Sequence, residues 1–262
     1  MSAHQKKAAL KENTQRRQKL SGKDEIGGFW LYGYHAVAAA LQNPQRKIYR
    51  LLLSKETARE LPQGLIPEDT GYEPAGRADF EQILPKGAVH QGIAAYVSPL
   101  PDTYETDLTP KDASVVVILD QVTDPHNVGA VLRSAAAFDA DAVIVTQRNA
   151  PEATGAMAKS ASGALELIPL IFVSNLARTM QTLKDKGYWC VGMDGSAEKT
   201  LRDAALPRKV ALVMGSEGYG LRRLTAQNCD FMVKLPISKR VESLNVSNAA
   251  AIALYDLKYK LA

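Results

Sequence analysis

The sequence predicts an α/β protein with two units, a small α/β unit followed by a larger one built on a parallel sheet. From Ser114 onward, short runs of β-branched and other apolar residues alternate with helical stretches, which is typical of parallel strands covered by helices on both faces. Before them, residues 98–110 contain three prolines and almost no apolar period, as linkers do. We therefore expect domains at 29–98 and 114–262, joined by a linker at 99–113.

Composition limits the class of protein. With 46% apolar and 23% charged residues among 262, the chain has the composition of a soluble globular protein. No apolar run reaches the roughly 18 residues that a membrane helix needs, and the segment after Met1 lacks the apolar core of a signal peptide. We expect a cytoplasmic protein with no membrane segment.

The first 28 residues form a basic tail. It holds seven lysines and arginines against three acidic residues, which accounts for the whole net charge of +4. Few apolar residues and no sustained helical period predict disorder in isolation. A flexible basic arm suits contacts with RNA phosphates, and a merely solubilising tail is the alternative.

The residue pattern predicts the order of elements in both units. The first unit has, in order, a helix at Tyr34–Leu41, a strand at Lys47–Leu53, a helix at Arg77–Leu84 and a strand at Gly92–Val97. The strands expected in the second unit are Val115–Leu119, Ala142–Thr146, Ile168–Val173, Trp189–Gly192 and Val210–Met214. Between them, a helix at Asn175–Lys186 has an N-cap in Ser174 and a stop in Gly187.

Polar residues follow three strands of the second unit. Val115–Asp120 leads into residues 124–133, and Val210–Met214 leads into Gly215–Gly220. A third apolar strand leads through the loop from Leu235 into a helix of small residues. Open α/β sheets bind ligands in the crevice at the carboxyl ends of their strands, so these junctions predict a site.

Five residues at these junctions are candidates for the site. Most have an ordinary structural role when taken singly: Asn127 and Asn245 as helix caps, Arg133 as a surface cation and Glu217 as a charge at a helix N-terminus. Five of them at the same kind of junction favour a functional site. The set is Asn127, Arg133, Glu217, Ser243 and Asn245.

The sequence argues against several familiar kinds of site. Gly215–Gly220 reads G-x-x-G-x-G, the reverse of the dinucleotide fingerprint, and no phosphate-loop lysine follows it. No G-x-S-x-G elbow surrounds a serine. Cys190 and Cys229 lack metal-ligand spacing, so we expect no metal site and two buried cysteines. His126, beside Pro125, is interpreted as a turn or capping residue rather than a catalytic one.

Three blocks of sequence resemble, in order and spacing, the three motifs of the SpoU (TrmH) family of RNA ribose 2′-O-methyltransferases. They are Asn127–Arg133, Leu212–Leu221 and Ser243–Ala249. Tyr32–Val37 and His90–Ala95 are similar to the opening and close of the small substrate-binding domain of that family, as found in its 23S rRNA guanosine methyltransferase branch.

This resemblance implies a homodimer that uses S-adenosylmethionine and acts on RNA. The first candidate for the RNA substrate is 23S rRNA. The resemblance also implies that residues 29–98 bind the RNA and that the sheet of residues 114–262 is tied in a trefoil knot, which periodicity alone would not suggest. By position, the cofactor would be bound at Gly215, Leu235 and Leu244, largely through the backbone. The catalytic set would be Asn127, Arg133, Glu217, Ser243 and Asn245.

Methyl transfer to a ribose hydroxyl needs an aligned nucleophile and the removal of its proton, and neither requires a metal. Arg133 would hold the phosphate next to the ribose or stabilise alkoxide charge. This orienting role is favoured over general base because a guanidinium is so hard to deprotonate. Glu217 would anchor the arginine or the substrate. The loop and the ribose would be positioned by Asn127, Ser243 and Asn245.

One position departs from the family pattern. The third motif reads Pro236-Ile-Ser-Lys239, with lysine where the family has glycine. Glycine permits a positive φ or a close backbone approach, so Lys239 implies a rearranged loop or a lost approach. It favours a second hypothesis, a non-catalytic RNA-binding protein that keeps the fold. A tRNA 2′-O-methyltransferase is a third, because the first domain and the tail would choose the substrate.

Overall fold

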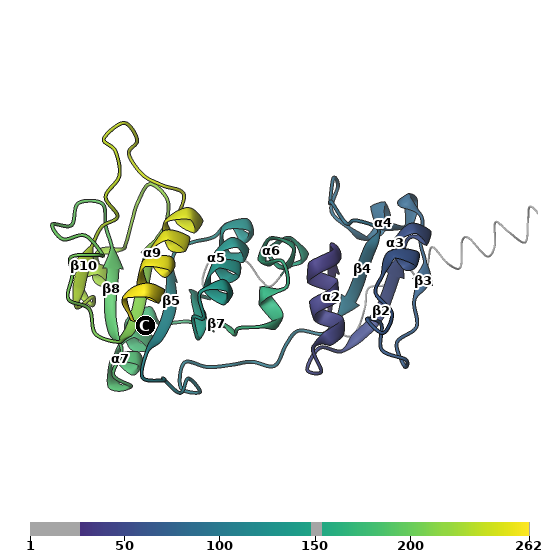
Figure 1. Ribbon diagram of the computed structural model, residues 1–262, viewed down its shortest axis with the longest axis horizontal. Coiled ribbons are helices and arrows are strands. Elements are labelled where there is room, and N and C mark those ends of the chain that lie inside the picture. The colour runs from purple at the N-terminus through teal and green to yellow at the C-terminus, as the bar shows by residue number, and fades with distance from the viewer. Residues whose placement is uncertain (1–26, 148–153, 262) are drawn as a thin grey trace, which may run out of the picture. The chain divides into compact units, whose positions relative to one another are not determined.

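The computed structural model describes residues 27–147 and 154–261. The chain divides into two compact units between Leu100 and Pro101, within the predicted linker 99–113. Of the basic tail only Gly27 and Gly28 are described, so the disorder expected for it falls outside the described residues. Figure 1 labels the helices and strands of both units.

The N-terminal unit is built on a mixed four-stranded sheet. The strand order is β1-β4-β2-β3, in which β4 runs antiparallel to β1 and β2, and β3 runs parallel to β2. Its strands are β1 (Phe29–Tyr32), β2 (Ile48–Leu53), β3 (Glu73–Pro74) and β4 (Ile93–Val97). Its helices are α2 (Tyr34–Gln42), α3 (Lys55–Glu60) and α4 (Arg77–Ile83).

The four predicted elements of this unit are confirmed to within one residue at each end. Side chains alternate across a strand, so one face of the sheet presents Leu52 and Ala94 to Phe80 of α4, which is 1% exposed. The sequence analysis missed β1, α3 and β3. The shortest of these, β3, has two residues and therefore no period to detect.

The C-terminal unit is a six-stranded sheet in the order β10-β8-β9-β5-β6-β7, and every neighbouring pair is parallel. The strands are β5 (Ser114–Asp120), β6 (Ala142–Thr146), β7 (Leu170–Val173), β8 (Trp189–Met193), β9 (Lys209–Gly215) and β10 (Phe231–Val233). The prediction of a parallel sheet is confirmed. The strand predicted from Ile168 begins two residues later, after Pro169, and the strand before Leu235 ends at Val233.

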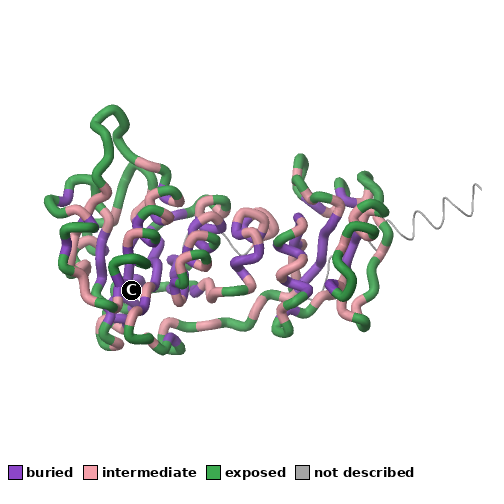
Figure 2. The backbone as a smooth tube through the Cα atoms, viewed as in Figure 1, coloured by how far each residue is buried: buried purple, intermediate pink, exposed green. Residues whose placement is uncertain are grey.

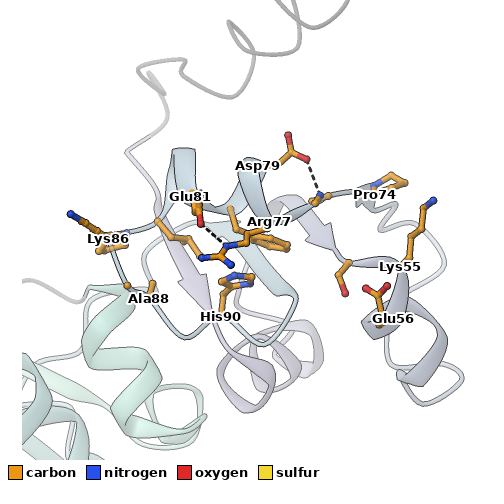
Figure 3. Close-up of a pocket in the computed structure, with 16 residues that line it drawn as sticks. Lys55, Glu56, Pro74, Arg77, Asp79, Glu81, Lys86, Ala88 and His90 are labelled. Atoms are coloured by element: carbon orange, nitrogen blue, oxygen red, sulfur yellow. Dashed lines mark hydrogen bonds and ion pairs between the residues drawn. The ribbon is translucent and has the colours of Figure 1, made fainter.

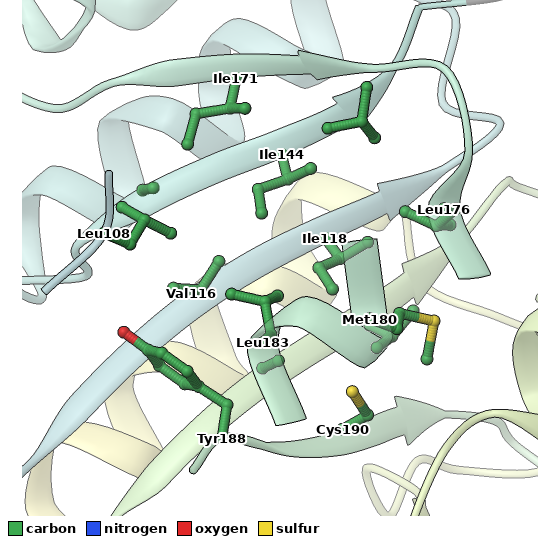
Figure 4. Close-up of a cluster of buried hydrophobic side chains, with 14 residues drawn as sticks. Leu108, Val116, Ile118, Ile144, Ile171, Leu176, Met180, Leu183, Tyr188 and Cys190 are labelled. Carbon is green, nitrogen blue, oxygen red and sulfur yellow. The ribbon is translucent and has the colours of Figure 1, made fainter. Parts of the chain in front are cut away.

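Helices cover both faces of this sheet, as predicted. On one side α5 (Pro125–Ala137) packs against α6 (Gly155–Ala161) and α9 (Val246–Lys260). On the other side α7 (Leu176–Asp185) adjoins α8 (Arg223–Gln227). Figure 4 shows α7 in front of the strands and α9, in yellow, behind them. The strand residues between these layers are buried, as Figure 2 shows.

The core under α7 joins apolar residues from all the central strands. Ile118, Ile144 and Ile171 are completely buried there and pack with Met180 and Leu183 of α7 (Figure 4). Burying one such side chain stabilises the fold by about 1.5–3 kcal/mol. Leu108 of the predicted linker joins the same cluster, and Lys186 Nζ donates to its carbonyl oxygen at 2.8 Å. This end of the linker therefore packs on the C-terminal unit.

The N-cap predicted for α7 is wrong by one residue. Asn175, rather than Ser174, accepts a hydrogen bond from Arg178 N at 3.1 Å, because the asparagine amide is also a good cap and stands next to the first helical residue. The predicted stop at Gly187 agrees with its φ of +87°.

The strand order reverses between β5 and β9, which pair along their full lengths although β6, β7 and β8 come between them in sequence. Such a reversal opens a crevice at the carboxyl ends of the two strands. Strand order and register do not describe how the chain threads through its own loops, so the trefoil knot stays a prediction.

Candidate active site

Three of the five predicted catalytic residues form one hydrogen-bonded network. Glu217 Oε1 accepts hydrogen bonds from Asn127 Nδ2 at 3.2 Å and from Asn245 Nδ2 at 2.6 Å. Asn245 Nδ2 also donates to Asn127 Oδ1 at 3.0 Å, and Val246 N donates to Glu217 Oε1 at 3.3 Å. The network thus ties together the segments that follow β5, β9 and β10. Glu217 Oε2 has no hydrogen-bond partner among the described residues and is free to bind a ligand.

Two helix starts place the asparagines. α5 has Asp124 as its N-cap, with Asp124 Oδ1 accepting from His126 N at 2.9 Å, so Asn127 stands inside the first turn. The suggestion that Asn127 is itself a cap is wrong. Asn245 is the N-cap of α9, with Oδ1 accepting from Ser247 N at 2.9 Å, so its amide oxygen caps the helix while its amide nitrogen serves the network. Since Asn245 Nδ2 donates to Asn127 Oδ1, the two helix starts lie together.

A tight loop after β9 carries Glu217. A Cβ on Gly215 would meet Gly220 C at 2.1 Å and Leu221 N at 2.4 Å, so only glycine lets the loop fold back onto the end of the strand. Gly220 N donates to Ser216 O at 3.0 Å and closes the loop, and Gly218 and Gly220 have φ of +81° and +65°. Glu217 lies in this loop rather than at the start of a helix, which corrects its suggested structural role.

An ion pair fixes the far end of this loop to the sheet. Asp120 is the last residue of β5, is completely buried and is paired in register with Gly215. Its Oδ1 accepts from Arg222 Nε at 2.8 Å and forms an ion pair with Arg222 Nη2 at 2.7 Å, and its Oδ2 accepts from Arg222 N at 3.1 Å. The loop from Ser216 to Leu221 is therefore held at both ends.

Beside the network lies a cavity of about 310 Å³, at the lower end of the usual size for small-molecule sites. The three predicted cofactor residues, Gly215, Leu235 and Leu244, all line it, and Glu217 and Ser243 do so as well. Its charged residues are three carboxylates and one lysine, so the wall is acidic. The full lining is Met193, Asp194, Gly195, Met214, Gly215, Ser216, Glu217, Gly218, Gly220, Lys234, Leu235, Ile237, Glu242, Ser243, Leu244, Val246 and Ala249.

Arg133 stands apart from the network. It lies on α5 six residues after Asn127, which turns its side chain about 120° around the helix and about 9 Å along it from that of Asn127. It is exposed and makes no hydrogen bond or ion pair with the described residues. Ser243 reaches the cavity but likewise has no hydrogen-bond partner in the described chain.

Lys239 is exposed and is not part of the cavity wall. Its φ is not positive, so the loop has a conformation that a lysine adopts without strain. The loop geometry therefore gives no sign that Lys239 obstructs the cavity.

The remaining residues discussed from the sequence lie outside the network. His126 Nδ1 lies 3.0 Å from Ser160 Oγ and links the start of α5 to α6. Burial raises the pKa of both cysteine thiols to about 12, so they stay protonated near neutral pH. Cys190 is buried as predicted, whereas Cys229 is only half-buried, and neither forms a disulfide.

Asp194 lines the cavity and was missed. It follows β8, so it stands at a fourth junction of the same kind as the three used above, and its Oδ1 accepts from Ser196 N at 2.7 Å. The run Met193-Asp194-Gly195 after an apolar strand was the available signal. Glu242 and Lys234 also line the cavity and had no such signal.

The N-terminal unit has an open hollow of about 1450 Å³ between α3, α4 and the loop to β4 (Figure 3). The His90 ring stacks on Phe80 with 4.1 Å between ring centroids, and His90 Nδ1 accepts from Gly92 N at 3.1 Å. Burial and then the charge of Arg77 lower the pKa of His90, which favours the neutral imidazole. Basic and acidic side chains are equal in number around the hollow: Lys55, Arg77 and Lys86 against Glu56, Asp79 and Glu81.

Among the described residues, no group of three or more His, Cys, Asp or Glu side chains could hold a metal ion. The helices of the same residues include none that is long and apolar enough to cross a membrane.

Comparisons with known proteins match both units. Residues 114–255 match the model of the SpoU rRNA Methylase family, and residues 30–103 match the model described as RNA 2′-O ribose methyltransferase substrate binding. The chain is 41% identical to 23S rRNA (guanosine-2′-O-)-methyltransferase RlmB of Photobacterium profundum, over 86% of this chain and 95% of that protein. It is 42% identical to the protein of the same name from Escherichia coli K12, over 86% and 96%.

Solved structures share the fold over nearly the whole chain. The SpoU methyltransferase AviRb from Streptomyces viridochromogenes, in complex with AdoMet, superposes with a TM-score of 0.77 at 23% identity, covering 94% of this chain and 96% of that one. An AdoMet-bound rRNA methyltransferase from Sinorhizobium meliloti gives 0.77 at 21% identity, covering 95% and 94%.

Proposed function

Because the chain belongs to the SpoU rRNA methylase family, we propose that it transfers a methyl group from S-adenosylmethionine to a ribose 2′-hydroxyl of a guanosine in 23S rRNA. The substrate is assigned from the relatives of about 41% identity, whose names state this reaction. One observation within the chain carries the proposal: Glu217 belongs both to the Asn127–Asn245 network and to the wall of the cavity. The protein would act in the cytoplasm.

The residues of the cavity fit S-adenosylmethionine. This molecule carries a sulfonium and an ammonium group against one carboxylate, and the acidic wall complements its net positive charge. Leu235, Ile237 and Leu244 offer apolar surface to an adenine ring. Gly215, Gly218 and Gly220 present bare backbone for hydrogen bonds, which suits recognition through main-chain groups.

The cofactor supplies an electron-poor methyl group for attack by an oxygen nucleophile. The protein must hold the ribose 2′-hydroxyl in line with it and stabilise the loss of the hydroxyl proton. Glu217 Oε2 would accept a hydrogen bond from that hydroxyl, because Oε1 is held by three donors. Asn127 and Asn245 fix the carboxylate, and Ser243 would contact the ribose from the cavity wall.

Arg133 would hold the phosphate next to the target ribose. Its guanidinium has no partner within the described chain and lies away from the network, which suits a phosphate contact better than contact with the reacting hydroxyl.

A second copy of the chain would complete this arrangement. On α9, Ile252, Tyr255 and Tyr259 are 44%, 47% and 71% exposed and recur at helical spacing along one stripe. Tyr255 also packs edge-on against Phe138, the residue that follows α5, the helix that carries Arg133. An apolar stripe of this kind suits a symmetric dimer, in which Arg133 of one copy would serve the site of the other.

Mixing two inactive variants tests this arrangement. If Arg133→Ala and Glu217→Gln are mixed and exchange subunits at random, about a quarter of the sites recover both wild-type residues when the arginine acts across the dimer. If it acts within its own chain, every site keeps one defect and the mixture stays inactive. Activity near a quarter of wild type would support the proposal, and none after proven exchange would refute it.

The function itself is tested by two matched carboxylate variants. Glu217→Gln keeps an oxygen for the network but replaces the free oxygen by an NH₂ group, so methyl transfer to RNA should fall roughly a hundredfold or more, with cofactor affinity near wild type. Glu198→Gln changes an exposed carboxylate of the same unit that lies outside the cavity wall and the network, and should stay active. Tritium transfer from labelled S-adenosylmethionine to 23S rRNA measures the rates, and calorimetry measures the affinities. Equal rates for the two variants would contradict the proposed site.

The alternative hypothesis, a non-catalytic RNA-binding protein that keeps the fold, was based on Lys239. Since Lys239 is exposed and outside the cavity wall, that support is lost.

A further inference from the structure

Tyr219 is the most exposed large hydrophobic side chain in the described part of the protein. Its exposed fraction is 92%, and the next highest, that of Leu167, is 73%. No ring contact, hydrogen bond or electrostatic interaction of Tyr219 exists within the described residues. An aromatic ring with this exposure contributes little to the fold, so removing it should leave stability almost unchanged.

The backbone that presents this ring is held firmly. Tyr219 lies between Gly218 and Gly220, whose positive φ values shape the turn. Gly220 N donates to Ser216 O at one side of the turn, and Arg222 is paired with the buried Asp120 just beyond it. A ring on an anchored turn loses little freedom when a flat ligand stacks on it, which lowers the entropic cost of binding.

The position of the turn relates the ring to the reaction. Tyr219 is two residues from Glu217, so the Cα atoms of the two are no more than about 8 Å apart. Gly218 and Gly220, on either side of Tyr219, line the cavity proposed for the cofactor, whereas Tyr219 itself does not. The backbone of Tyr219 is therefore close to that of Glu217, and its side chain lies outside the cavity wall.

Cations without partners occupy the neighbouring segments. Arg223 begins α8 four residues after Tyr219, and Lys239 and Arg240 lie in the loop that forms another wall of the cavity. All three are exposed, and none makes an ion pair within the described chain. Free cations on the segments around an exposed aromatic ring suit single-stranded RNA, since the phosphates need charge and the bases need flat surfaces.

We propose that Tyr219 stacks on the base of an unpaired nucleotide in the substrate RNA, close to the nucleotide that is methylated. The inference rests on the proposed function, because it assigns one contact of the same RNA. Stacking on an aromatic ring tolerates any base, so Tyr219 contributes affinity and placement rather than sequence selection.

The test compares Tyr219→Ala, Tyr219→Phe and a control, Tyr104→Ala, which removes a 54% exposed tyrosine from the linker. Equilibrium binding and KM are measured with 23S rRNA fragments, cofactor affinity by calorimetry, and mass by sedimentation. Losing one stacked base typically costs about 1–3 kcal/mol, which corresponds to about 5- to 150-fold weaker RNA binding. We expect this loss for Tyr219→Ala, recovery for Tyr219→Phe, and unchanged RNA binding for Tyr104→Ala. Cofactor affinity should be the same throughout.

Equal RNA affinity for Tyr219→Ala and the wild type would overturn the inference while leaving the proposed function intact. Conversion of a wild-type dimer to a monomer by Tyr219→Ala would assign the ring to a protein interface and also overturn it. A wild-type protein that methylates no RNA would refute the proposed function itself, and one that binds no RNA would refute both.

Discussion

Removing the Arg222 side chain should destabilise the protein more than its half-exposed position suggests. The guanidinium makes the two contacts to Asp120 Oδ1, and Asp120 is completely buried. Arg222→Ala would leave that carboxylate with one hydrogen bond, from the backbone N of residue 222. Breaking a buried pair in this way costs about 3–5 kcal/mol, and we expect about 3 because the arginine side chain is 47% exposed and water can reach the gap.

The two partners differ in burial, because Asp120 is buried and Arg222 is half-exposed, and this difference predicts how the single variants compare. Asp120→Ala leaves an arginine that can turn into solvent, so it should cost less than Arg222→Ala, and the double variant should be more stable than Arg222→Ala alone. The control is Arg202→Ala. The pair of Arg202 with Asp256 has side-chain exposures of 74% and 13%, so water reaches it more easily than the pair at Asp120 and its loss should cost less.

Urea denaturation followed by fluorescence measures the free energies of unfolding, and calorimetric titration with S-adenosylmethionine reports whether the loop has loosened. We expect at least tenfold weaker cofactor binding for Arg222→Ala. Arg202→Ala should bind the cofactor as tightly as the wild type does. If Arg222→Ala were as stable as Arg202→Ala and bound the cofactor like wild type, the anchoring role of the pair would be refuted.

Three further outcomes follow from the site and the tail. Arg133→Ala should lower methyl transfer roughly a hundred- to thousandfold, about 2.7–4 kcal/mol, with cofactor binding unchanged; retained activity in a tritium-transfer assay would remove it from the site. Lys239→Gly should change cofactor affinity less than about tenfold, because the lysine is exposed, and a large gain by calorimetry would mean that it blocks the cavity. Deleting residues 1–28 should flatten the dependence of RNA affinity on salt, by roughly 0.7–0.9 in slope for each lost phosphate contact; an unchanged slope would make the tail a solubility element.

The sequence predicted the parts of the fold that have a strong local signal. Ala142–Thr146 matches β6 at both ends, because it is an unbroken run of apolar and β-branched residues bounded by a turn. β3 has two residues and depends on its pairing with β2, which no local pattern reveals. The N-cap of α7 was misplaced because Ser174 and Asn175 are both good caps and only the backbone geometry chooses between them.

The candidate site also has residues that could be predicted from the sequence and residues that could not. Asn127, Glu217 and Asn245 could be grouped from the sequence because each follows a strand of one parallel sheet, whose carboxyl ends share an edge. The orientation of Arg133 could not be predicted from the sequence, since it depends on the turn of α5. Asp120 and Arg222 are 102 residues apart, and their pairing depends on the contact between β5 and β9 that the reversal of strand order creates.

Mapping of 2′-O-methyl groups tests the central claim most directly. The purified protein is incubated with S-adenosylmethionine and unmodified 23S rRNA, with Glu217→Gln as the inactive control, and ribose methylation is read at every nucleotide by resistance to alkaline cleavage. We predict one protected guanosine that depends on both the cofactor and Glu217. Methylation confined to tRNA, methylation of a base instead of a ribose, or firm cofactor binding with no RNA methylated would contradict it.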